Sequence, residues 1–322
     1  MARRGWGYWT EAKLDILSAY LPAFTTASKS VGSTTYLDLF AGHADNERRD
    51  TGVDVKGSAI RALEVMPPLT DLYFCDLPHV ASELRAALTA QFPNREFNVV
   101  AGDSNLTIDA TLEQIRRDGK AWQPTFAFID PYNIGSLHWA TLEKLAAFKH
   151  MPRSKYKVEL WILFMGSAIQ RQLGLETAEQ KHMVSRLFGS EEWRPIAASL
   201  NGQEAFDEYT NLMRWRLENV LGYASTHFLR LNNVSGTYIY DLIFATDNAV
   251  GDRIMASVYN SALQSNERMR LEAFELRRAD RTLQSSLFDA ATMATSTDLS
   301  ALKYVHEPPE PPLVNEARRR DR

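Results

Sequence analysis

The chain has 322 residues and a formal net charge of −4, with 45% hydrophobic and 11% aromatic residues. This composition is sufficient for a substantial buried core. The net charge argues against a general attraction to nucleic acid, although short basic clusters leave local phosphate contacts open. Cys75 is the only cysteine, which excludes an internal disulfide and any Cys-rich metal or iron–sulfur site within the chain.

The pattern of apolar residues gives no sign of export or membrane insertion. Two arginines lie near the N-terminus, but no apolar segment of the secretory type follows them. The longest apolar run, 160–165, has the size of a strand and is too short to span a bilayer. We therefore expect a cytoplasmic protein without a membrane partner.

The first half of the chain alternates between helical and strand patterns. Thr10 can cap a helix over 9–27, which has hydrophobic residues along one face. Strands are predicted at 35–40, 71–75, 97–101, 126–129 and 158–165. Helices are predicted between them at 58–65, 81–92, 108–118 and 139–148, whereas the polar segment 43–56 is predicted to be a loop. Short apolar strands that alternate with helices indicate a parallel sheet covered on both faces.

The last two predicted strands break this alternation. Segments 224–231 and 237–245 are rich in β-forming residues, and the turn-forming segment 232–236 joins them as a hairpin. The long segment 166–222 is predicted to be a mostly helical insertion. We therefore predict an α/β fold: a doubly wound, mostly parallel sheet of the class I methyltransferase (Rossmann-like) type that ends in an antiparallel hairpin.

Three regions follow from these patterns. Residues 1–34 are predicted to form an N-terminal helical segment, and 35–265 the methyltransferase-like α/β domain. Residues 266–322 are predicted to form an Arg-rich helix over 266–281 and a disordered or extended tail rich in proline and arginine.

Acidic residues follow four successive predicted strands: Asp38, Asp76, Asp103 and Asp130. In open parallel sheets, ligands bind beyond the carboxyl ends of the strands, where the strand order reverses. Singly, Asp76 or Asp103 could instead be a helix N-cap, because aspartate is common at that position. Four acidic residues at one edge are harder to explain by capping alone.

These positions fit S-adenosylmethionine, whose ammonium, ribose hydroxyls and adenine amine are all hydrogen-bond donors. Asp38 and the turn after it would receive the methionine end, since Gly42 lets the backbone approach closely. Asp76 would accept from the ribose hydroxyls, and Asp103 from the adenine amine. The predicted cofactor-binding residues are Asp38, Phe40, Ala41, Gly42, Asp76, Asp103 and Ser104.

The segment Asp130-Pro131-Tyr132 is the sharpest candidate for a catalytic site. Pro131 fixes its backbone and leaves its carbonyl free as an acceptor, Asp130 supplies a second acceptor, and Tyr132 supplies an aromatic face. Two acceptors can orient an amine toward a sulfonium methyl group. The same residues, followed by Asn133, also suit an ordinary turn. No histidine spacing indicates a metal site.

The chain resembles the three-Cys-motif partner protein (TcmP) family, whose members are similar to Rossmann-type methyltransferases. The resemblance covers roughly residues 6–260, and the motifs that carry it are an N-terminal helix with Trp9, Lys13-Leu14 and Tyr20-Leu21, then Tyr36-Leu37-Asp38-Leu39-Phe40-Ala41-Gly42, Lys56-Gly57-Ser58-Ala59, Gly102-Asp103-Ser104-Asn105, Phe128-Ile129-Asp130-Pro131-Tyr132, Gly166 and Ile169-Gln170-Arg171. The chain departs from the family pattern at Ala44, where a second glycine is usual, and at Asn133, where glycine is common.

This resemblance implies a protein partner with three cysteines, of the iron–sulfur or radical type. The leading hypothesis is a methyltransferase that uses S-adenosylmethionine and acts on a nitrogen or oxygen nucleophile, with a nucleic acid or nucleotide-like substrate left open. The alternative is a catalytically degenerate module of the same fold that binds its partner protein without turnover. A nicotinamide-linked oxidoreductase is disfavoured, because the first loop lacks the Gly-x-Gly-x-x-Gly pattern.

Overall fold

A seven-stranded sheet forms the centre of the computed structural model, which describes residues 5–48, 52, 54–149, 156–282 and 299–313. Its order is β6-β5-β2-β7-β8-β10-β9. The strands are β2 (Thr35–Asp38), β5 (Asp71–Asp76), β6 (Asn98–Ala101), β7 (Thr125–Ile129), β8 (Glu159–Phe164), β9 (Ser225–Asn232) and β10 (Tyr238–Thr246). Strand β8 is buried along its whole length, and all its residues after Glu159 are apolar rather than alternating with polar ones.

The strand directions match the prediction of a mostly parallel sheet with a terminal hairpin. Strands β5, β6, β2, β7 and β8 pair in parallel, whereas β10 is antiparallel to both β8 and β9. The chain passes from β2 outward through β5 to β6, then returns to β7 on the other side of β2. The strand order therefore reverses between β2 and β7, where a crevice opens at the carboxyl ends of the strands in such sheets.

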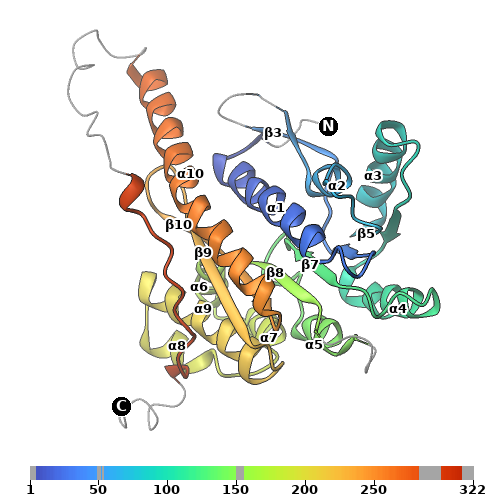
Figure 1. Ribbon diagram of the computed structural model, residues 1–322. Helices are drawn as coiled ribbons and strands as arrows, with labels where there is room; N and C mark the ends of the chain where they lie inside the picture. Colours follow the sequence, from blue (N-terminus) through green and yellow to red (C-terminus); the bar gives the residue numbers. More distant parts are fainter. Residues whose placement is uncertain (1–4, 49–51, 53, 150–155, 283–298, 314–322) are drawn as a thin grey trace.

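Helices cover both faces of the sheet, as predicted. One face carries α1 (Tyr8–Ala27), α2 (Ser58–Leu63), α3 (Pro78–Gln91) and α10 (Ala249–Thr282). Helices α1 and α10 lie side by side across this face (Figure 1). Tyr20 of α1 lies among the core residues and is fully buried, so the N-terminal segment is an integral part of the α/β domain.

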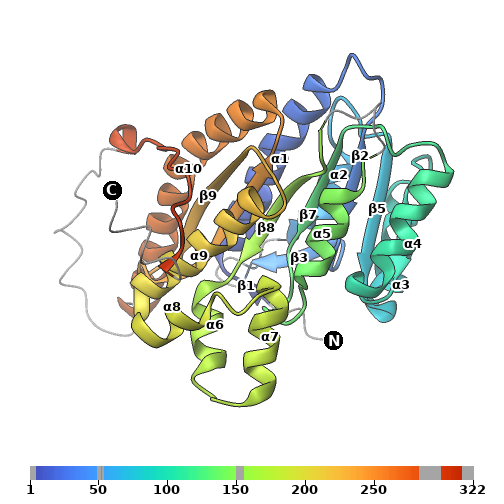
Figure 2. The same ribbon diagram turned by 90° about the horizontal axis from the view of Figure 1, so that it is seen from below.

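The other face carries α4 (Ser104–Arg117), α5 (Trp139–Ala147), α6 (Gly166–Leu173), α7 (Ala178–Phe188), α8 (Arg194–Ser199) and α9 (Gly202–Asn219). Helices α6 to α9 make up the predicted helical insertion, and α6 and α7 extend beyond the end of β8 (Figure 2). None of the described helices is long and apolar enough to cross a membrane.

Three parts of the fold differ from the prediction. The segment 43–56 was predicted to be a loop, but it contains β3 (Asp45–Arg48) and β4 (Asp54–Lys56), which form a small sheet with β1 (Gly5–Trp6). Their residues are polar and the strands very short, so the hydrophobic pattern that marks a buried strand is absent.

The predicted domain boundary at 265/266 falls inside α10, which begins at Ala249 and not at 266. Beyond it, residues 299–313 include a short 3-10 helix, η1 (Leu299–Ala301), and an extended stretch. That stretch is anchored to α9 and β9: Arg214 donates to the carbonyl of Glu307, and His306 contacts the carbonyl of Thr226 at 3.0 Å. The tail is thus extended and packed over these residues rather than disordered. The rest of the predicted tail lies outside the described residues.

Candidate functional site

Asp38 ends β2 at the point where the strand order reverses, and its side chain is fully buried. Its Oδ1 accepts from the backbone N–H of Phe40 at 3.4 Å, and its Oδ2 accepts from the Tyr36 hydroxyl at 3.3 Å. Burial raises the pKa of Asp38 to about 7, and the nearby carboxylates of Asp130 and Asp76 act in the same direction. A hydrogen bond from Ser58, at the start of α2, opposes that rise.

Asp76 ends β5, the neighbouring strand, and is almost completely buried. Its two oxygens accept from the backbone N–H groups of Gly42 and Leu77, each at 2.7 Å, and from the Tyr132 hydroxyl. Gly42 has φ = +64°, in the left-handed region that glycine adopts without strain. The turn therefore points the backbone N–H of Gly42, in the loop after β2, at the Asp76 carboxylate at the end of β5.

Tyr132 is half exposed but its hydroxyl reaches into this site. Its ring meets that of Phe40 edge to face, with centroids 6.1 Å apart and planes at 82°. Desolvation and the hydrogen bond to Asp76 raise the pKa of Tyr132 well above its usual range, so the hydroxyl stays protonated and donates a hydrogen bond to Asp76. In this arrangement the Tyr132 hydroxyl is hydrogen-bonded to the Asp76 carboxylate, which we expect to receive the ribose hydroxyls.

Asp130, after β7, forms an ion pair with Lys13 of α1, and the lysine side chain is only 9% exposed. The ion pair uses Oδ2 of Asp130. Lys13 did not figure among the predicted site residues. The signal was its position four residues before Leu17, within the apolar face of a helix, where an unpaired lysine is costly to bury. Pro131, between Asp130 and Tyr132, is buried.

Asp103 caps helix α4, the alternative that its sequence position suggested. Its Oδ1 accepts from the backbone N–H of Asn105 at 2.9 Å and from the Asn105 side chain at 2.8 Å. Ser104 donates its hydroxyl to the carbonyl of Leu39, so it joins the β6–α4 turn to the end of β2. Asp103 is exposed at the edge of the site and is not among the carboxylates that act on Asp38.

Asn105 is a buried residue of this region that the sequence analysis did not single out. Its amide donates to the carbonyl of Ser136 at 2.8 Å, and its oxygen accepts from the backbone N–H of His138 at 3.0 Å. Asn105 therefore fixes the loop that follows Asp-Pro-Tyr against the start of α4. Its place in the resemblance motif was the only signal in the sequence.

The strand ends thus bring Asp38, Asp76 and Asp130 together. The carboxylates of Asp130 and Asp76 both act on Asp38, and the ammonium group of Lys13 pairs with Asp130. Such an arrangement attracts a cationic ligand and repels an anionic one. No group of three or more His, Cys, Asp or Glu residues in the described part of the chain could hold a metal ion.

A second pair of buried ionisable groups lies at the opposite, amino edge of the sheet. Glu159 begins β8 and accepts hydrogen bonds from the Tyr20 hydroxyl at 2.6 Å and from Thr246 at 2.9 Å. Burial raises the pKa of Glu159 to about 7 and lowers that of Lys149 to about 7. The length of the strands separates this pair from the carboxyl edge.

The comparisons with known proteins leave the site to be interpreted from its own geometry. No protein-family model matches the chain, and a comparison with curated proteins finds no match.

Proposed function

We propose that this chain is a methyltransferase that uses S-adenosylmethionine and acts on a nitrogen or oxygen nucleophile. The observation that carries the proposal is the cluster of Asp38, Asp76 and Asp130 at the point where the strand order reverses. A ligand with a sulfonium and an ammonium group suits this cluster of carboxylates, of which only Asp130 is paired with a lysine. The strand order supports the same class: numbered along the chain, the seven main strands run 3-2-1-4-5-7-6, and only the seventh is reversed.

The free acceptor atoms at this edge fit the groups of the cofactor. Asp103 uses only Oδ1 to cap α4, which leaves Oδ2 for the adenine amine. Asp76 would receive the ribose hydroxyls after the Tyr132 hydroxyl turns away, and that half-exposed side chain has room to move. Asp38 would stabilise the ammonium group through the low dielectric of its surroundings.

For the acceptor, Asp130 offers its Oδ1, since Lys13 binds Oδ2. The cofactor supplies a methyl group on a positively charged sulfur. Asp130 and the Pro131 carbonyl would orient the acceptor so that its lone pair attacks the methyl carbon as the carbon–sulfur bond breaks. Transfer would leave a neutral thioether, and the acceptor would lose its proton to solvent. Positioning and electrostatics therefore supply the catalysis.

The test compares cofactor binding by two aspartate variants. Asp76→Asn keeps the shape of the side chain and removes its charge, and we expect it to weaken S-adenosylhomocysteine binding by about tenfold or more, the loss of a charge-assisted hydrogen bond. Asp109→Asn makes the same change on the exposed face of α4, where Asp109 pairs with Lys144, and should bind normally. Equal binding by both variants would place the ribose elsewhere.

A second candidate function is a module that binds a three-Cys-motif partner protein without turnover. The contacts within the site favour this candidate, because the Tyr132 hydroxyl is hydrogen-bonded to Asp76 and Lys13 pairs with one oxygen of Asp130. This candidate predicts a folded protein that binds neither S-adenosylmethionine nor S-adenosylhomocysteine.

A further inference from the structure

A cavity of about 360 Å³ lies between the start of α6, the start of α9 and the start of β10. Helix α6 contributes Ser167, Gln170 and Arg171, which share one face because they are three and four residues apart. Phe206, Thr237 and Tyr238 complete the lining. The cavity thus combines two aromatic rings, three neutral polar side chains and one cation, without a lining carboxylate.

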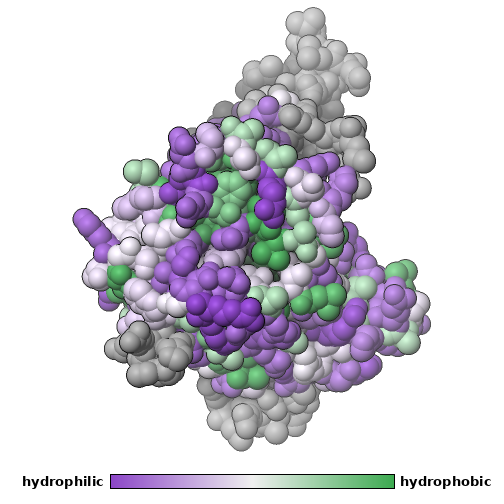
Figure 3. Space-filling model, turned by 90° about the vertical axis from the view of Figure 1, so that its right-hand side faces the viewer, coloured by the Kyte–Doolittle hydropathy of each residue, from purple (hydrophilic) through white to green (hydrophobic). Residues whose placement is uncertain are grey.

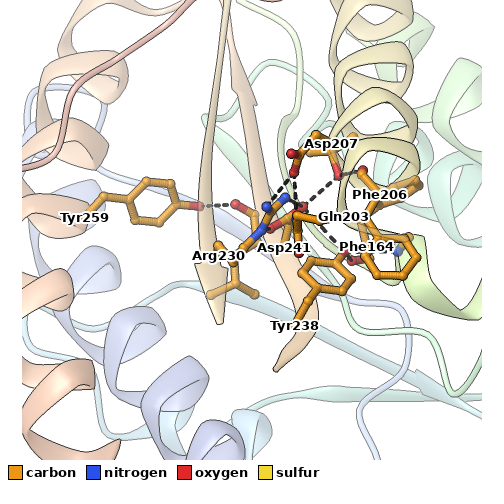
Figure 4. Close-up of polar contacts among 11 residues, drawn as sticks. Phe164, Gln203, Phe206, Asp207, Arg230, Tyr238, Asp241 and Tyr259 are labelled. Carbon is orange, nitrogen blue, oxygen red and sulfur yellow. Dashed lines mark hydrogen bonds and ion pairs between the residues drawn. The ribbon is translucent and has the colours of Figure 1, made fainter. Parts of the chain in front are cut away.

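Buried polar contacts hold the aromatic wall of this cavity in place. The rings of Phe206 and Tyr238 stack with centroids 5.1 Å apart, and the Arg230 guanidinium lies 4.8 Å from the Tyr238 ring centroid. Arg230 in turn forms two hydrogen bonds of 2.9 Å with the fully buried Asp241 and an ion pair with Asp207 (Figure 4). The nearby carboxylates are therefore bound to Arg230 and are not directed at a ligand.

The hydroxyl of Tyr238 also fixes the approach of α6. It accepts from the backbone N–H of Gly166 at 3.0 Å and contacts the carbonyl of Phe164 at 3.2 Å. A Cβ on Gly166 would lie 3.2 Å from this hydroxyl and 3.4 Å from the backbone of Phe206. Glycine at this position therefore lets α6 pack closely against Phe206 and Tyr238, and Arg171 of the same helix lines the cavity.

Arg171 is the unusual member of the lining. It is exposed, and its side chain forms no ion pair or hydrogen bond with the residues that the structure describes. A cavity at the β6 edge, between α3 and α4, offers a contrast and measures about 270 Å³. Figure 3 shows the molecule from the side on which α3 and α4 lie, where hydrophobic residues are interspersed among hydrophilic ones. The arginine of that cavity, Arg85, donates to the carbonyl of Val99 and so is part of the fold.

We propose that the cavity between α6, α9 and β10 binds a nucleotide, with its phosphate on Arg171 and its base on the partly exposed Phe206, whose ring the buried Tyr238 supports. Guanidinium groups bind phosphate with matched geometry, and bases stack on aromatic side chains regardless of sequence. The hydroxyls of Ser167 and Thr237 can pair with base edges or ribose hydroxyls, whereas the Gln170 amide already contacts the backbone N–H of Gly202 and the side chain of Asn201. The volume also suits a ligand of this size.

The cavity opens at the same edge of the sheet as Asp130. Strand β8 separates β7 from β10, so the two lie about 10 Å apart at the usual strand spacing. The use of a bound base as a methyl acceptor rests on the proposed function, but its binding does not.

The experiment titrates the full chain, without S-adenosylmethionine, with the four ribonucleoside monophosphates, the corresponding nucleosides and a six-residue single-stranded oligonucleotide. Arg171→Gln should weaken monophosphate binding by about tenfold or more and leave nucleoside binding nearly unchanged. Phe206→Ala should weaken both by about fivefold or more. Arg186→Gln, the same change on an exposed residue of α7 outside the cavity, is the matched control and should bind as the unaltered protein does.

Tighter binding of the oligonucleotide than of any monophosphate would identify a residue of a single strand as the ligand, and the reverse would identify a free nucleotide. The proposal is overturned if no monophosphate binds at millimolar concentration, if aromatic carboxylates bind in their place, or if Arg171→Gln and Arg186→Gln behave alike. A separate titration with S-adenosylhomocysteine reports on the methyltransferase proposal, so failure of one is distinguishable from failure of the other.

Discussion

The buried carboxyl of Asp38 makes cofactor affinity depend on pH in a direction that can be calculated. Its pKa in the free protein is about 7, so about one Asp38 in thirty is ionised at pH 5.5 and about half at pH 7. A ligand ammonium beside Asp38 stabilises the ionised form and lowers this pKa, so binding releases a proton. Affinity should therefore rise with pH, by about fifteenfold or about 1.6 kcal/mol between pH 5.5 and pH 7.

Calorimetric titration with S-adenosylhomocysteine at pH 5.5, 6.25 and 7, in two buffers with different heats of ionisation, measures both the affinity and the proton release. The α-amino group of the ligand stays largely protonated over this range. Asp38→Asn should bind more weakly at pH 7 and show no proton release. An affinity that stays constant or falls between pH 5.5 and pH 7 would refute the placement of the ammonium beside Asp38.

Three further predictions concern single side chains. Tyr132→Phe removes the hydroxyl that donates a hydrogen bond to Asp76, so calorimetry should show cofactor binding tightened by about fivefold, the value of one hydrogen bond. Weaker binding would mean that the hydroxyl contacts the ligand. Lys13→Met leaves the partly buried Asp130 without its counter-charge and should lower the free energy of unfolding in urea by about 1 kcal/mol, and an unchanged value would show that the ion pair is dispensable. Burial raises the pKa of Glu159 to about 7, so the folded state holds a proton that the unfolded state has lost, and stability falls as pH rises from about 4.5 to 7. In urea titrations at pH 4.5 and pH 8, Glu159→Gln should remove about 3 kcal/mol of this fall in the free energy of unfolding. An unaltered pH dependence would contradict the burial argument.

The types of the main elements could be predicted because local pattern decides them. Continuous apolar runs such as β8 and the alternation of short strands with amphipathic helices indicate a doubly wound sheet without reference to distant contacts. The rule that ligands bind at strand ends then located Asp38, Asp76 and Asp130, which the fold brings together.

The pairings inside the site could not be predicted, because they join residues far apart in the chain. Lys13 and Asp130 are 117 positions apart, and Tyr132 and Asp76 are 56 apart. Only the relative placement of α1, β5 and β7 determines these contacts. Asp103 shows the converse: capping is a local interaction, and the sequence already suggested it as the alternative to cofactor binding.

The predicted boundaries of elements were wrong where packing, rather than local composition, decides the structure. A proline-rich segment is extended for local reasons, but whether it packs depends on partners such as Arg214, which lies on α9 and binds the carbonyl of Glu307. In the same way, β3 and β4 are polar strands that pair with each other and with β1, so hydrophobic periodicity does not mark them.

The most direct test of the central claim is calorimetric titration of the unaltered protein with S-adenosylmethionine and S-adenosylhomocysteine at pH 7. The account predicts binding of both with micromolar affinity, on the order of −8 kcal/mol. Absence of binding to either by a folded protein would contradict the methyltransferase proposal and favour the partner-binding module.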